Sequence, residues 1–202
     1  MKLLSRVIKF FICKFLYRVE YHNIEVLDKY PTYLICPNHS CVLDPVFVFP
    51  TKYDGDIYIV AKQELFKHAS FRWLAKRYNV FAIDRENVDV RSMLKSLAVF
   101  KENDKAKLII FPEGKVVSDE EEVGKVYKKG ATFVASHINK PIIPVYITRK
   151  PVFFHKVDVV YGEPYMIGTE NGKGKKLDNI SVELINKIYS LKKETNKWNL
   201  LD

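Results

Sequence analysis

The stretch 34-LICPNHSCVLDPVFVF-49 places a polar turn between two apolar runs. Residues 33–36 are short and apolar throughout, which is typical of a strand that is buried on both faces of a sheet. Pro45 suits the first position of a helix, with Asp44 before it as the N-cap, so we expect a helix over 45–52. A strand, a turn and a helix in succession are the repeating unit of an α/β fold.

The alternation of strand-like and helix-like segments continues along the chain. The expected strands are rich in Val, Ile, Tyr and Phe and cover 24–27, 33–36, 56–61, 80–83, 107–111, 142–147 and 157–162. The expected helices cover 45–52, 64–78, 88–103, 119–138 and 180–194, and Ser118 with Glu121 predicts a capping box at the start of the fourth. We therefore predict one α/β domain whose mainly parallel or mixed central sheet is flanked by helices.

Length and composition limit the class of protein. With 202 residues, of which 48% are hydrophobic, the chain is long enough for one α/β domain and too apolar to be disordered. The formal net charge of +9 favours an anionic partner, such as phospholipid headgroups, nucleic acid, or an acidic protein or phosphorylated substrate. The three cysteines show no disulfide-like spacing, which favours a reduced cytosolic setting.

The N-terminal segment has the pattern of a helix that lies in the plane of a membrane surface. Residues 1–18 place Leu and Phe side chains at helical spacing, and Lys and Arg side chains interrupt them. No uncharged run approaches the roughly 20 residues that a membrane-spanning helix needs, and the charges also divide the apolar region of a signal peptide. We predict an amphipathic membrane-interface helix over 1–22 and a main domain over 23–202. The alternative is a first helix that packs on the domain and exposes its charges to water.

Three polar clusters follow three of the predicted strands. They are Asn38 and His39, Asp84 and Arg85, and Pro112 to Gly114. In open α/β sheets, ligands bind outside the carboxyl ends of the strands. We therefore expect the three clusters to form a binding site at one edge of the sheet.

His39 and Asp44 are the candidates for acid–base chemistry at that edge. On a continuous helix, residues five apart point about 140° from each other, so these side chains meet only if a turn separates them. A carboxylate at the helix start then holds one ring nitrogen and leaves the other free as a general base for a hydroxyl. The alternative is that Asp44 only caps its helix and His39 is a polar loop residue.

Metal binding and a cysteine nucleophile are weaker interpretations of the same stretch. Cys36, His39 and Cys41 lack the C-x2-C spacing of zinc sites, and no second Cys/His cluster follows them. Residues two apart in a tight turn seldom face each other, which disfavours activation of a Cys41 nucleophile by His39. We therefore predict no metal site.

Basic residues near the other strand ends favour an anionic substrate group. Arg85 suits bidentate phosphate recognition, or it forms a salt bridge with a neighbouring carboxylate such as Asp84. Gly114 allows a ligand to approach the backbone closely, and Lys115 offers a point charge beside it. Glu113 either binds a substrate hydroxyl or balances the charge of these cations.

Together, the motifs resemble the four blocks of the glycerolipid acyltransferase family, whose best-known bacterial members are 1-acylglycerol-3-phosphate acyltransferases (lysophosphatidate acyltransferases). The matching stretches lie within about residues 33–165 and are 38-NHSCVLD-44, 61-AKQELF-66, 84-DR-85, 111-FPEG-114, 127-YKKGATFVA-135, 143-IPVYI-147 and 162-GEP-164. The resemblance implies that 23–202 is the catalytic domain of an enzyme of phospholipid biosynthesis. Such an enzyme moves a fatty acyl chain from an acyl thioester to the free glycerol hydroxyl of a lysophospholipid. With 1-acylglycerol-3-phosphate as acceptor, the product is phosphatidic acid.

The resemblance also assigns roles to residues. It implies that His39 is the general base on the acceptor hydroxyl, that Asp44 orients it, and that Arg85 binds the acceptor phosphate. The FPEG block is implied at the acceptor site and Pro144 on the acyl-donor side. The full set of substrate-binding candidates is Asn38, Arg85, Phe111, Pro112, Glu113, Gly114, Lys115 and Pro144. The acyl donor is expected to be a thioester of acyl carrier protein or of coenzyme A, without any further cofactor.

Three positions depart from the family pattern. Cys41 stands where the family usually has serine, and Asn79 stands where the second block often starts with glycine. After Gly114 the family usually continues Thr-Arg-Ser, whereas this chain continues with Lys115 and two valines. Because the third-block arginine is missing, the identity of the acceptor headgroup stays open. Lys115 is the nearby cation that offers a substitute for this arginine.

Several alternatives follow from these departures. The acceptor is either lysophosphatidate or another lysophospholipid or lyso-aminolipid, and a catalytically silent membrane-binding module is a further alternative. Nucleic-acid binding rests on net charge alone, since no recognised nucleic-acid motif is present. We expect a peripheral membrane protein that binds anionic lipid on the cytoplasmic face of the cell membrane.

Overall fold

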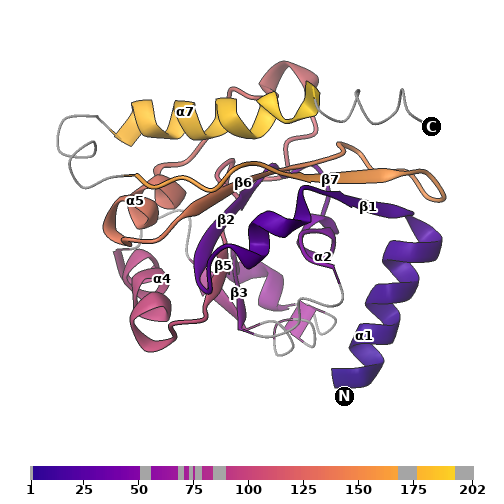
Figure 1. Ribbon diagram of the computed structural model, residues 1–202, viewed down its shortest axis with the longest axis horizontal. Coiled ribbons are helices and arrows are strands. Elements are labelled where there is room, and N and C mark those ends of the chain that lie inside the picture. Colours follow the sequence, from indigo (N-terminus) through magenta and orange to yellow (C-terminus); the bar gives the residue numbers. More distant parts are fainter. Residues whose placement is uncertain are drawn as a thin grey trace.

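A sheet with helices on both faces forms the centre of the protein (Figure 1). The computed structural model describes residues 2–50, 56–67, 71–72, 75, 79–83, 90–167 and 177–193. Within these ranges the sheet has seven strands in the order β1-β7-β6-β2-β5-β3-β4. The strands are β1 (Val19–His22), β2 (Tyr33–Pro37), β3 (Ile57–Lys62), β4 (Val80–Ile83), β5 (Lys107–Ile109), β6 (Ile142–Ile147) and β7 (Val157–Tyr161). All neighbouring pairs are parallel except β6 and β7, which confirms the predicted mainly parallel or mixed sheet.

The helices cover the two faces of this sheet unequally. They are α1 (Lys2–Phe11), α2 (Asp44–Phe47), α4 (Val90–Glu102), α5 (Lys129–His137) and α7 (Leu177–Ser190), with a π-helical turn η1 (Ile12–Leu16) and 3-10 turns η2 (Ile24–Asp28), η3 (Gln63–Lys67) and η4 (Glu120–Glu122). One buried cluster joins α4, α5 and α7 to one face, and a second joins α2 and η2 to the other. In Figure 1, α7 lies along β6, and α1 stands at the side of the molecule that carries the N-terminus.

β2 is buried on both faces, as its apolar sequence predicts. Tyr33 and Ile35 belong to the cluster on the α2 side, whereas Leu34 and Cys36 belong to the cluster on the α5 and α7 side. All four side chains are fully buried. Successive strand residues point to opposite faces, so only a strand between two layers of helices is apolar at every position.

Several predicted elements agree with the structure. β4 and β6 coincide with the predicted ranges 80–83 and 142–147, and β2, β3, β5 and β7 differ from prediction by one or two residues at their ends. α4 and α7 match the predicted helices 88–103 and 180–194 with shifted ends. The predicted helix 64–78 lies partly outside the described residues, and its described start is η3.

Other predictions were wrong for local reasons. The predicted strand 24–27 forms η2, because Asn23 adopts a left-handed conformation with φ +57° and turns the chain. The predicted helix 119–138 begins only at Lys129: Asp119, not Ser118, caps the short turn η4, and Gly124 has φ +72°. The predicted helix 45–52 forms only the four-residue α2, which ends at Phe47, and Pro50 disfavours a helical conformation at the residue before it.

The N-terminal segment contributes a strand as well as a helix. β1 pairs in parallel with β7, from Val19 beside Val157 to His22 beside Val160. The last four residues of the segment 1–22 therefore belong to the sheet, and its helical part ends at Leu16. In the part of the chain that the structure describes, none of the helices combines the length and the apolar character that crossing a membrane requires.

Gly162 follows β7 and lies directly beside Pro144 of β6, so there is little space for a larger side chain at this position. A Cβ atom on Gly162 would lie 2.8 Å from Pro144 Cγ and 3.3 Å from both Cδ atoms of Leu191. Gly162→Ala should therefore lower the free energy of unfolding by about 1–3 kcal/mol, as overpacking does in a dense core. Urea denaturation measures this change.

Gly130→Ala is the matched control for this substitution. A Cβ atom on Gly130 meets nothing within 4 Å, and the residue lies in α5, where alanine is favoured over glycine by up to about 1 kcal/mol. This variant should unfold at an equal or higher urea concentration than the wild type. An unchanged midpoint for Gly162→Ala would contradict the close approach of β7 to Pro144.

Candidate active site

The structure brings His39 and Asp44 together at the carboxyl end of β2. His39 Nδ1 lies 3.0 Å from Asp44 Oδ2. The Asp44 side chain is fully buried, whereas that of His39 is 14% exposed. No described residue hydrogen-bonds His39 Nε2, so with Nδ1–H donated to the carboxylate, Nε2 presents its lone pair towards solvent or substrate.

The Asp44 carboxylate also shapes the turn that carries His39. Asp44 Oδ2 accepts hydrogen bonds from the backbone N–H groups of Ser40 at 2.7 Å and Cys41 at 2.8 Å. Asp44 is the first residue of α2, and the preceding residue, Leu43, makes no side-chain cap. The prediction of Asp44 as an N-cap was therefore wrong, because its carboxylate binds the turn before the helix instead of the N–H groups of the helix. One oxygen thus fixes both the turn and the imidazole.

The FPEG stretch lies beside this turn because β5 is the parallel neighbour of β2. The Phe111 ring packs on the His39 ring with centroids 4.2 Å apart and planes tilted by 30°. The His39 N–H donates to Glu113 Oε2 at 2.7 Å, and the Val117 N–H donates to the His39 carbonyl at 2.8 Å. The expectation that the clusters after 33–36 and 107–111 share one edge of the sheet is confirmed. The third cluster, with Asp84 and Arg85, lies outside the described residues.

Glu113 links the active-site turn to the C-terminal helix. Its side chain is buried, with one oxygen on the His39 N–H and the other accepting a hydrogen bond from the Tyr189 hydroxyl of α7. Burial raises the pKa of Glu113, while hydrogen bonds from Tyr189 and His39 and the positive charge of Arg149 oppose the rise. Sequence reasoning missed Tyr189, because a tyrosine in an amphipathic helix carries no signal of a partner 76 residues away.

Asn38 joins β2 to β6 immediately before His39. Its side chain is fully buried. Its Oδ1 accepts from the Ile147 N–H at 2.6 Å and its Nδ2 donates to the Ile147 carbonyl at 3.0 Å. These two bonds extend the pairing of the strands past Pro37 and Val145. Asn38 was predicted to bind substrate, and the contacts seen here make it a group that positions the His39 backbone.

The other predicted residues around this turn are held by the protein itself. Gly114 has φ +71°, and a Cβ atom there would lie 2.6 Å from Lys128 Cγ, so the position favours glycine. Pro112 is buried, and its carbonyl accepts the Lys128 N–H at 2.7 Å. Lys115 Nζ forms an exposed ion pair with Glu122 at 2.7 Å. Pro144 lies in β6 beside Cys36, within the sheet.

The cysteines in this region are poor nucleophiles. Cys36 is fully buried, and burial raises the pKa of its thiol. Burial is also the largest cause that raises the pKa of Cys41, whose Sγ accepts the Leu43 N–H at 3.4 Å. A raised pKa lowers the fraction of reactive thiolate at neutral pH. The thiols therefore do not compete with His39 and Asp44 for the chemistry of this edge.

Arg149 is a cation at this edge that sequence reasoning missed. It follows β6 by two residues, and its side chain is 8% exposed and ion-paired with Glu120. The strand-end rule that singled out Arg85 applies equally to an arginine after 142–147. Arg149 is therefore a residue that the sequence signal was able to find.

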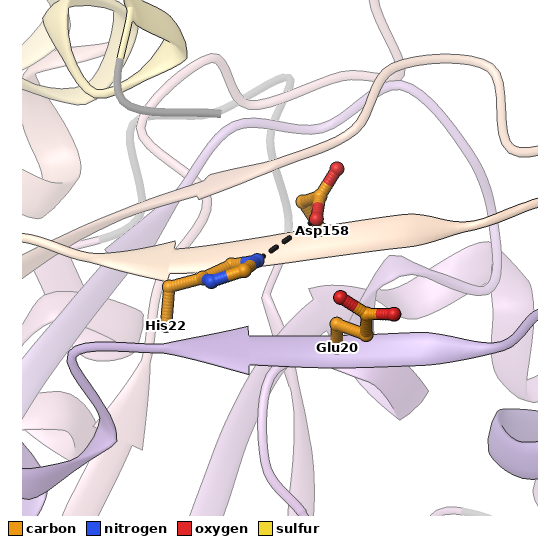
Figure 2. Close-up of side chains that lie close together, drawn as sticks. All are labelled: Glu20, His22 and Asp158. Atoms are coloured by element: carbon orange, nitrogen blue, oxygen red, sulfur yellow. Dashed lines mark hydrogen bonds and ion pairs between the residues drawn. The ribbon is translucent and has the colours of Figure 1, made fainter. Parts of the chain in front are cut away.

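One group of three side chains among the described residues is arranged closely enough to share a cation. Figure 2 shows Glu20 and His22 on β1 with Asp158 beside them on β7. Their ligand atoms lie within 4.8 Å of one another, and His22 Nε2 lies 2.8 Å from Asp158 Oδ1. Lys156 Nζ lies 2.8 Å from Glu20 and 3.6 Å from Asp158. The ammonium already pairs with both carboxylates, and His22 hydrogen-bonds Asp158, so the group links the edge strand β1 to β7.

The chain is similar to known acyltransferases in sequence and in fold. A family model described as Acyltransferase matches residues 18–148, the range that contains His39, Asp44 and Glu113. The 1-acyl-sn-glycerol-3-phosphate acyltransferase of Bacillus subtilis (strain 168) is 26% identical over 151 residues, which cover 72% of this chain and 73% of that protein. The crystal structure of the 1-acyl-sn-glycerophosphate (LPA) acyltransferase PlsC from Thermotoga maritima shares the fold, with a TM-score of 0.60 and 22% identity over 84% of this chain and 68% of that one.

The buried Glu113 carboxyl should make stability depend on pH. Its pKa is raised from the ordinary value of 4.5, so the folded protein holds this proton more tightly than the unfolded chain does. The stability from this group is present below that value and is lost as the pH rises through the folded-state pKa. Glu113→Gln has no proton to lose. The free energy of unfolding of the variant minus that of the wild type should therefore increase with pH from 4.5 upwards.

Urea denaturation at several pH values measures this difference. Tyr189→Phe serves as a second variant, because it removes a hydrogen bond that lowers the Glu113 pKa and should extend the pH dependence to higher pH. A difference between wild type and Glu113→Gln that stays constant or falls with rising pH would contradict the raised pKa.

Proposed function

The chain belongs to the acyltransferase family, and on this basis we propose that it moves a fatty acyl chain from an acyl thioester to the free glycerol hydroxyl of 1-acylglycerol-3-phosphate, giving phosphatidic acid. The observation that carries the proposal is the His39–Asp44 pair, with one ring nitrogen held by a buried carboxylate and the other without a partner among the described residues. The similarity to the Bacillus subtilis enzyme supports the choice of acceptor.

In the proposed reaction, His39 Nε2 takes the proton of the acceptor hydroxyl as its oxygen attacks the thioester carbonyl. The new C–O ester bond forms and the C–S bond breaks. The thiolate that leaves recovers the proton from the imidazolium. The buried charge of Asp44 stabilises that imidazolium through Nδ1, and general-base assistance of this kind contributes about 10²–10⁴-fold in rate. The thioester of acyl carrier protein or coenzyme A is the donor, and no further cofactor takes part.

Other residues serve this reaction by holding His39 in place. Asp44 Oδ2 and Glu113 Oε2 accept three successive backbone N–H groups, those of His39, Ser40 and Cys41. A general base that is fixed from both sides needs little reorganisation when the hydroxyl arrives. Arg85 stays our proposal for contact with the acceptor phosphate, from its sequence context alone.

We also propose that the protein rests on anionic lipid at the cytoplasmic face of the cell membrane. Five phenylalanines form an exposed surface that we term the aromatic patch: Phe10, Phe11, Phe15, Phe153 and Phe154, each 49–65% exposed. The Phe154 N–H donates to the Leu16 carbonyl at 2.6 Å, and the Phe153 and Tyr17 rings lie 5.1 Å apart, so the loop after β6 joins the N-terminal helix.

The surroundings of the aromatic patch suit a membrane surface. Arg6, Lys14 and Arg18 of the same segment are exposed. Phenylalanine rings enter the headgroup boundary, while nearby basic side chains each contribute roughly 1 kcal/mol on an anionic leaflet. A membrane location brings the enzyme to an acceptor and a product that both reside in the bilayer.

The first experiment tests the reaction. Wild-type protein with acyl thioesters of both carrier types and a panel of lysophospholipids should form phosphatidic acid, detected by mass spectrometry. His39→Ala should lower kcat by about 10²–10⁴-fold with an unchanged thermal unfolding midpoint, and His137→Ala, an exposed histidine of α5, is the matched control. Product from a different acceptor alone would replace the proposed substrate. Wild-type turnover in His39→Ala would remove the general-base role.

The second experiment tests the aromatic patch. Replacing Phe153 and Phe154 together by serine should lower binding to anionic vesicles about ten- to hundredfold, because each half-exposed ring loses part of its transfer free energy. Co-sedimentation with phosphatidylglycerol vesicles measures binding. Val182→Ser on α7, where the valine is 42% exposed, is the control and should bind like the wild type. Equal binding by the double variant and the wild type would contradict the membrane role of the loop.

A further inference from the structure

Arg149 lies at the same edge of the sheet as His39. It follows β6, the parallel neighbour of β2, and the Asn38 side chain clamps Ile147 at the end of β6. The Lys150 N–H donates to Ser40 Oγ at 3.1 Å, one residue from His39. The backbone on both sides of Arg149 is therefore fixed against the turn that carries the general base.

The Arg149 guanidinium has hydrogen-bonding capacity that the described residues leave unused. The side chain is 8% exposed, and Nη2 lies 3.2 Å from Glu120 Oε1. Nε and Nη1 are buried, and neither makes a hydrogen bond of ordinary geometry to a described residue, although the Tyr189 hydroxyl lies close enough to interact with the guanidinium. A guanidinium carries five N–H donors, and leaving buried donors unpaired is unfavourable. Such a group favours an additional anionic or polar ligand at this place.

The charge of Arg149 reaches the active-site network. It lowers the pKa of Glu113, opposing the larger effect of burial, and it acts in the same direction on Tyr189. Glu113 in turn holds the His39 N–H. The guanidinium therefore lies within electrostatic range of the groups that position His39.

Lys115 is less suited than Arg149 to replace the missing third-block arginine. Its ammonium is paired with Glu122, and the side chain is 48% exposed. An ammonium is a strongly hydrated point charge, whereas a guanidinium binds phosphate oxygens in a bidentate manner and is more weakly hydrated. Arg149 carries a guanidinium, as the missing third-block arginine does. Its burial strengthens the attraction between this guanidinium and a phosphate.

Glu120 stands where an anionic ligand would stand. This 66% exposed carboxylate lies on η4 and bridges Arg149 at 3.2 Å and Lys150 at 2.7 Å. Hydrogen bonds from Lys150 and Arg149 hold the pKa of Glu120 below its ordinary value. Exposed ion pairs of this kind are weak. A phosphate monoester, with more charge and more acceptor oxygens, is therefore able to displace the carboxylate from Arg149.

We propose that Arg149 recognises the anionic headgroup of the acceptor in place of the missing third-block arginine, and that Glu120 occupies this position until the acceptor binds. The proposal rests on the proposed function, since it concerns the acceptor of that same reaction. It names phosphate monoesters as the ligand class. Arg149 acts on headgroup affinity and selectivity, while His39 carries out the proton transfer.

The kinetic test compares a phosphorylated and an uncharged acceptor. The selectivity is kcat/KM for 1-acylglycerol-3-phosphate divided by kcat/KM for monoacylglycerol. Arg149→Met should lower this ratio about ten- to hundredfold, the range of a charge-assisted hydrogen bond, and Arg149→Lys should restore part of it. Lys115→Gln should lower the ratio less than Arg149→Met does. Equal losses in Lys115→Gln and Arg149→Met, or an unchanged ratio in Arg149→Met, would overturn the proposal.

Glu120→Gln tests whether Glu120 occupies the headgroup position until the acceptor binds, and it should strengthen acceptor binding, whereas Arg149→Met should weaken it. Removing the competing carboxylate should lower KM for 1-acylglycerol-3-phosphate about two- to fivefold, because an exposed ion pair is weak. Glu163→Gln breaks a similarly exposed pair, with Lys29, and is the matched control. A raised KM in Glu120→Gln would show that Glu120 assists the acceptor instead of competing with it, which would overturn its assigned role.

A direct binding measurement separates this proposal from the proposed function. Isothermal titration of sn-glycerol 3-phosphate into wild-type protein needs no acyl donor and no turnover. Wild type should bind more tightly than Arg149→Met and more weakly than Glu120→Gln. This order of affinities would support the site even if 1-acylglycerol-3-phosphate is not the preferred acceptor.

Equal binding by folded wild type and Arg149→Met, or no binding by either, would overturn the proposed headgroup site even if phosphatidic acid is formed. If Arg149→Met does not fold, Arg149→Lys and Glu120→Gln decide the same question.

Discussion

The active site depends on one buried oxygen atom. Asp44 Oδ2 accepts the N–H groups of Ser40 and Cys41 and the His39 ring nitrogen, all within 3.0 Å. An ionised carboxylate is stable in a buried position only where several donors replace water. The geometry of the turn and the charge of Asp44 therefore require each other, and an imidazole at this point is oriented by the same atom that folds the turn. In the proposed mechanism, the catalytic and structural roles of Asp44 are therefore inseparable.

Glu113 provides a second buried carboxylate on the other side of the same backbone. It binds the His39 N–H with one oxygen and Tyr189 of α7 with the other, so the proposed general base is coupled to the helix that covers β6. The two carboxylates have different surroundings. At Asp44, one oxygen accepts three hydrogen bonds. At Glu113, burial is the largest influence on the carboxyl group and raises its pKa. The FPEG stretch thus supports the general base through its backbone as well as lining the expected acceptor site.

The parts that sequence predicted are those decided by local pattern. β2, β4 and β6 are apolar over short ranges, and their limits follow from Pro and polar residues beside them. His39 and Asp44 are five residues apart, so a turn was enough to bring them together. η2 was mistaken for a strand because a short apolar run has no periodicity that separates the two structures. Tyr189 was missed because its partner lies 76 residues away and nothing in its local sequence indicates that contact. Arg149 follows the predicted strand 142–147, so the strand-end rule was able to find it, although its pairing with Glu120, 29 residues away, has no local signal.

The loop after β6 carries both Arg149, our proposed headgroup contact, and Phe153 and Phe154 of the aromatic patch that we propose to rest on the membrane. Arg149 and Phe153 are four residues apart in the chain, so their Cα atoms lie no more than about 14 Å from each other. The polar headgroup region on each side of a bilayer is roughly 5–8 Å thick. A lipid whose acyl chain stays in the hydrocarbon beneath the aromatic patch therefore needs to rise only a short distance for its phosphate to meet the guanidinium. The Lys150 N–H of the same loop donates to Ser40 Oγ, so this loop also contacts the turn that carries His39. In our proposals, membrane contact, headgroup recognition and base positioning share one short segment, and this placement suits an arginine after β6 to a role that the family assigns to its third block.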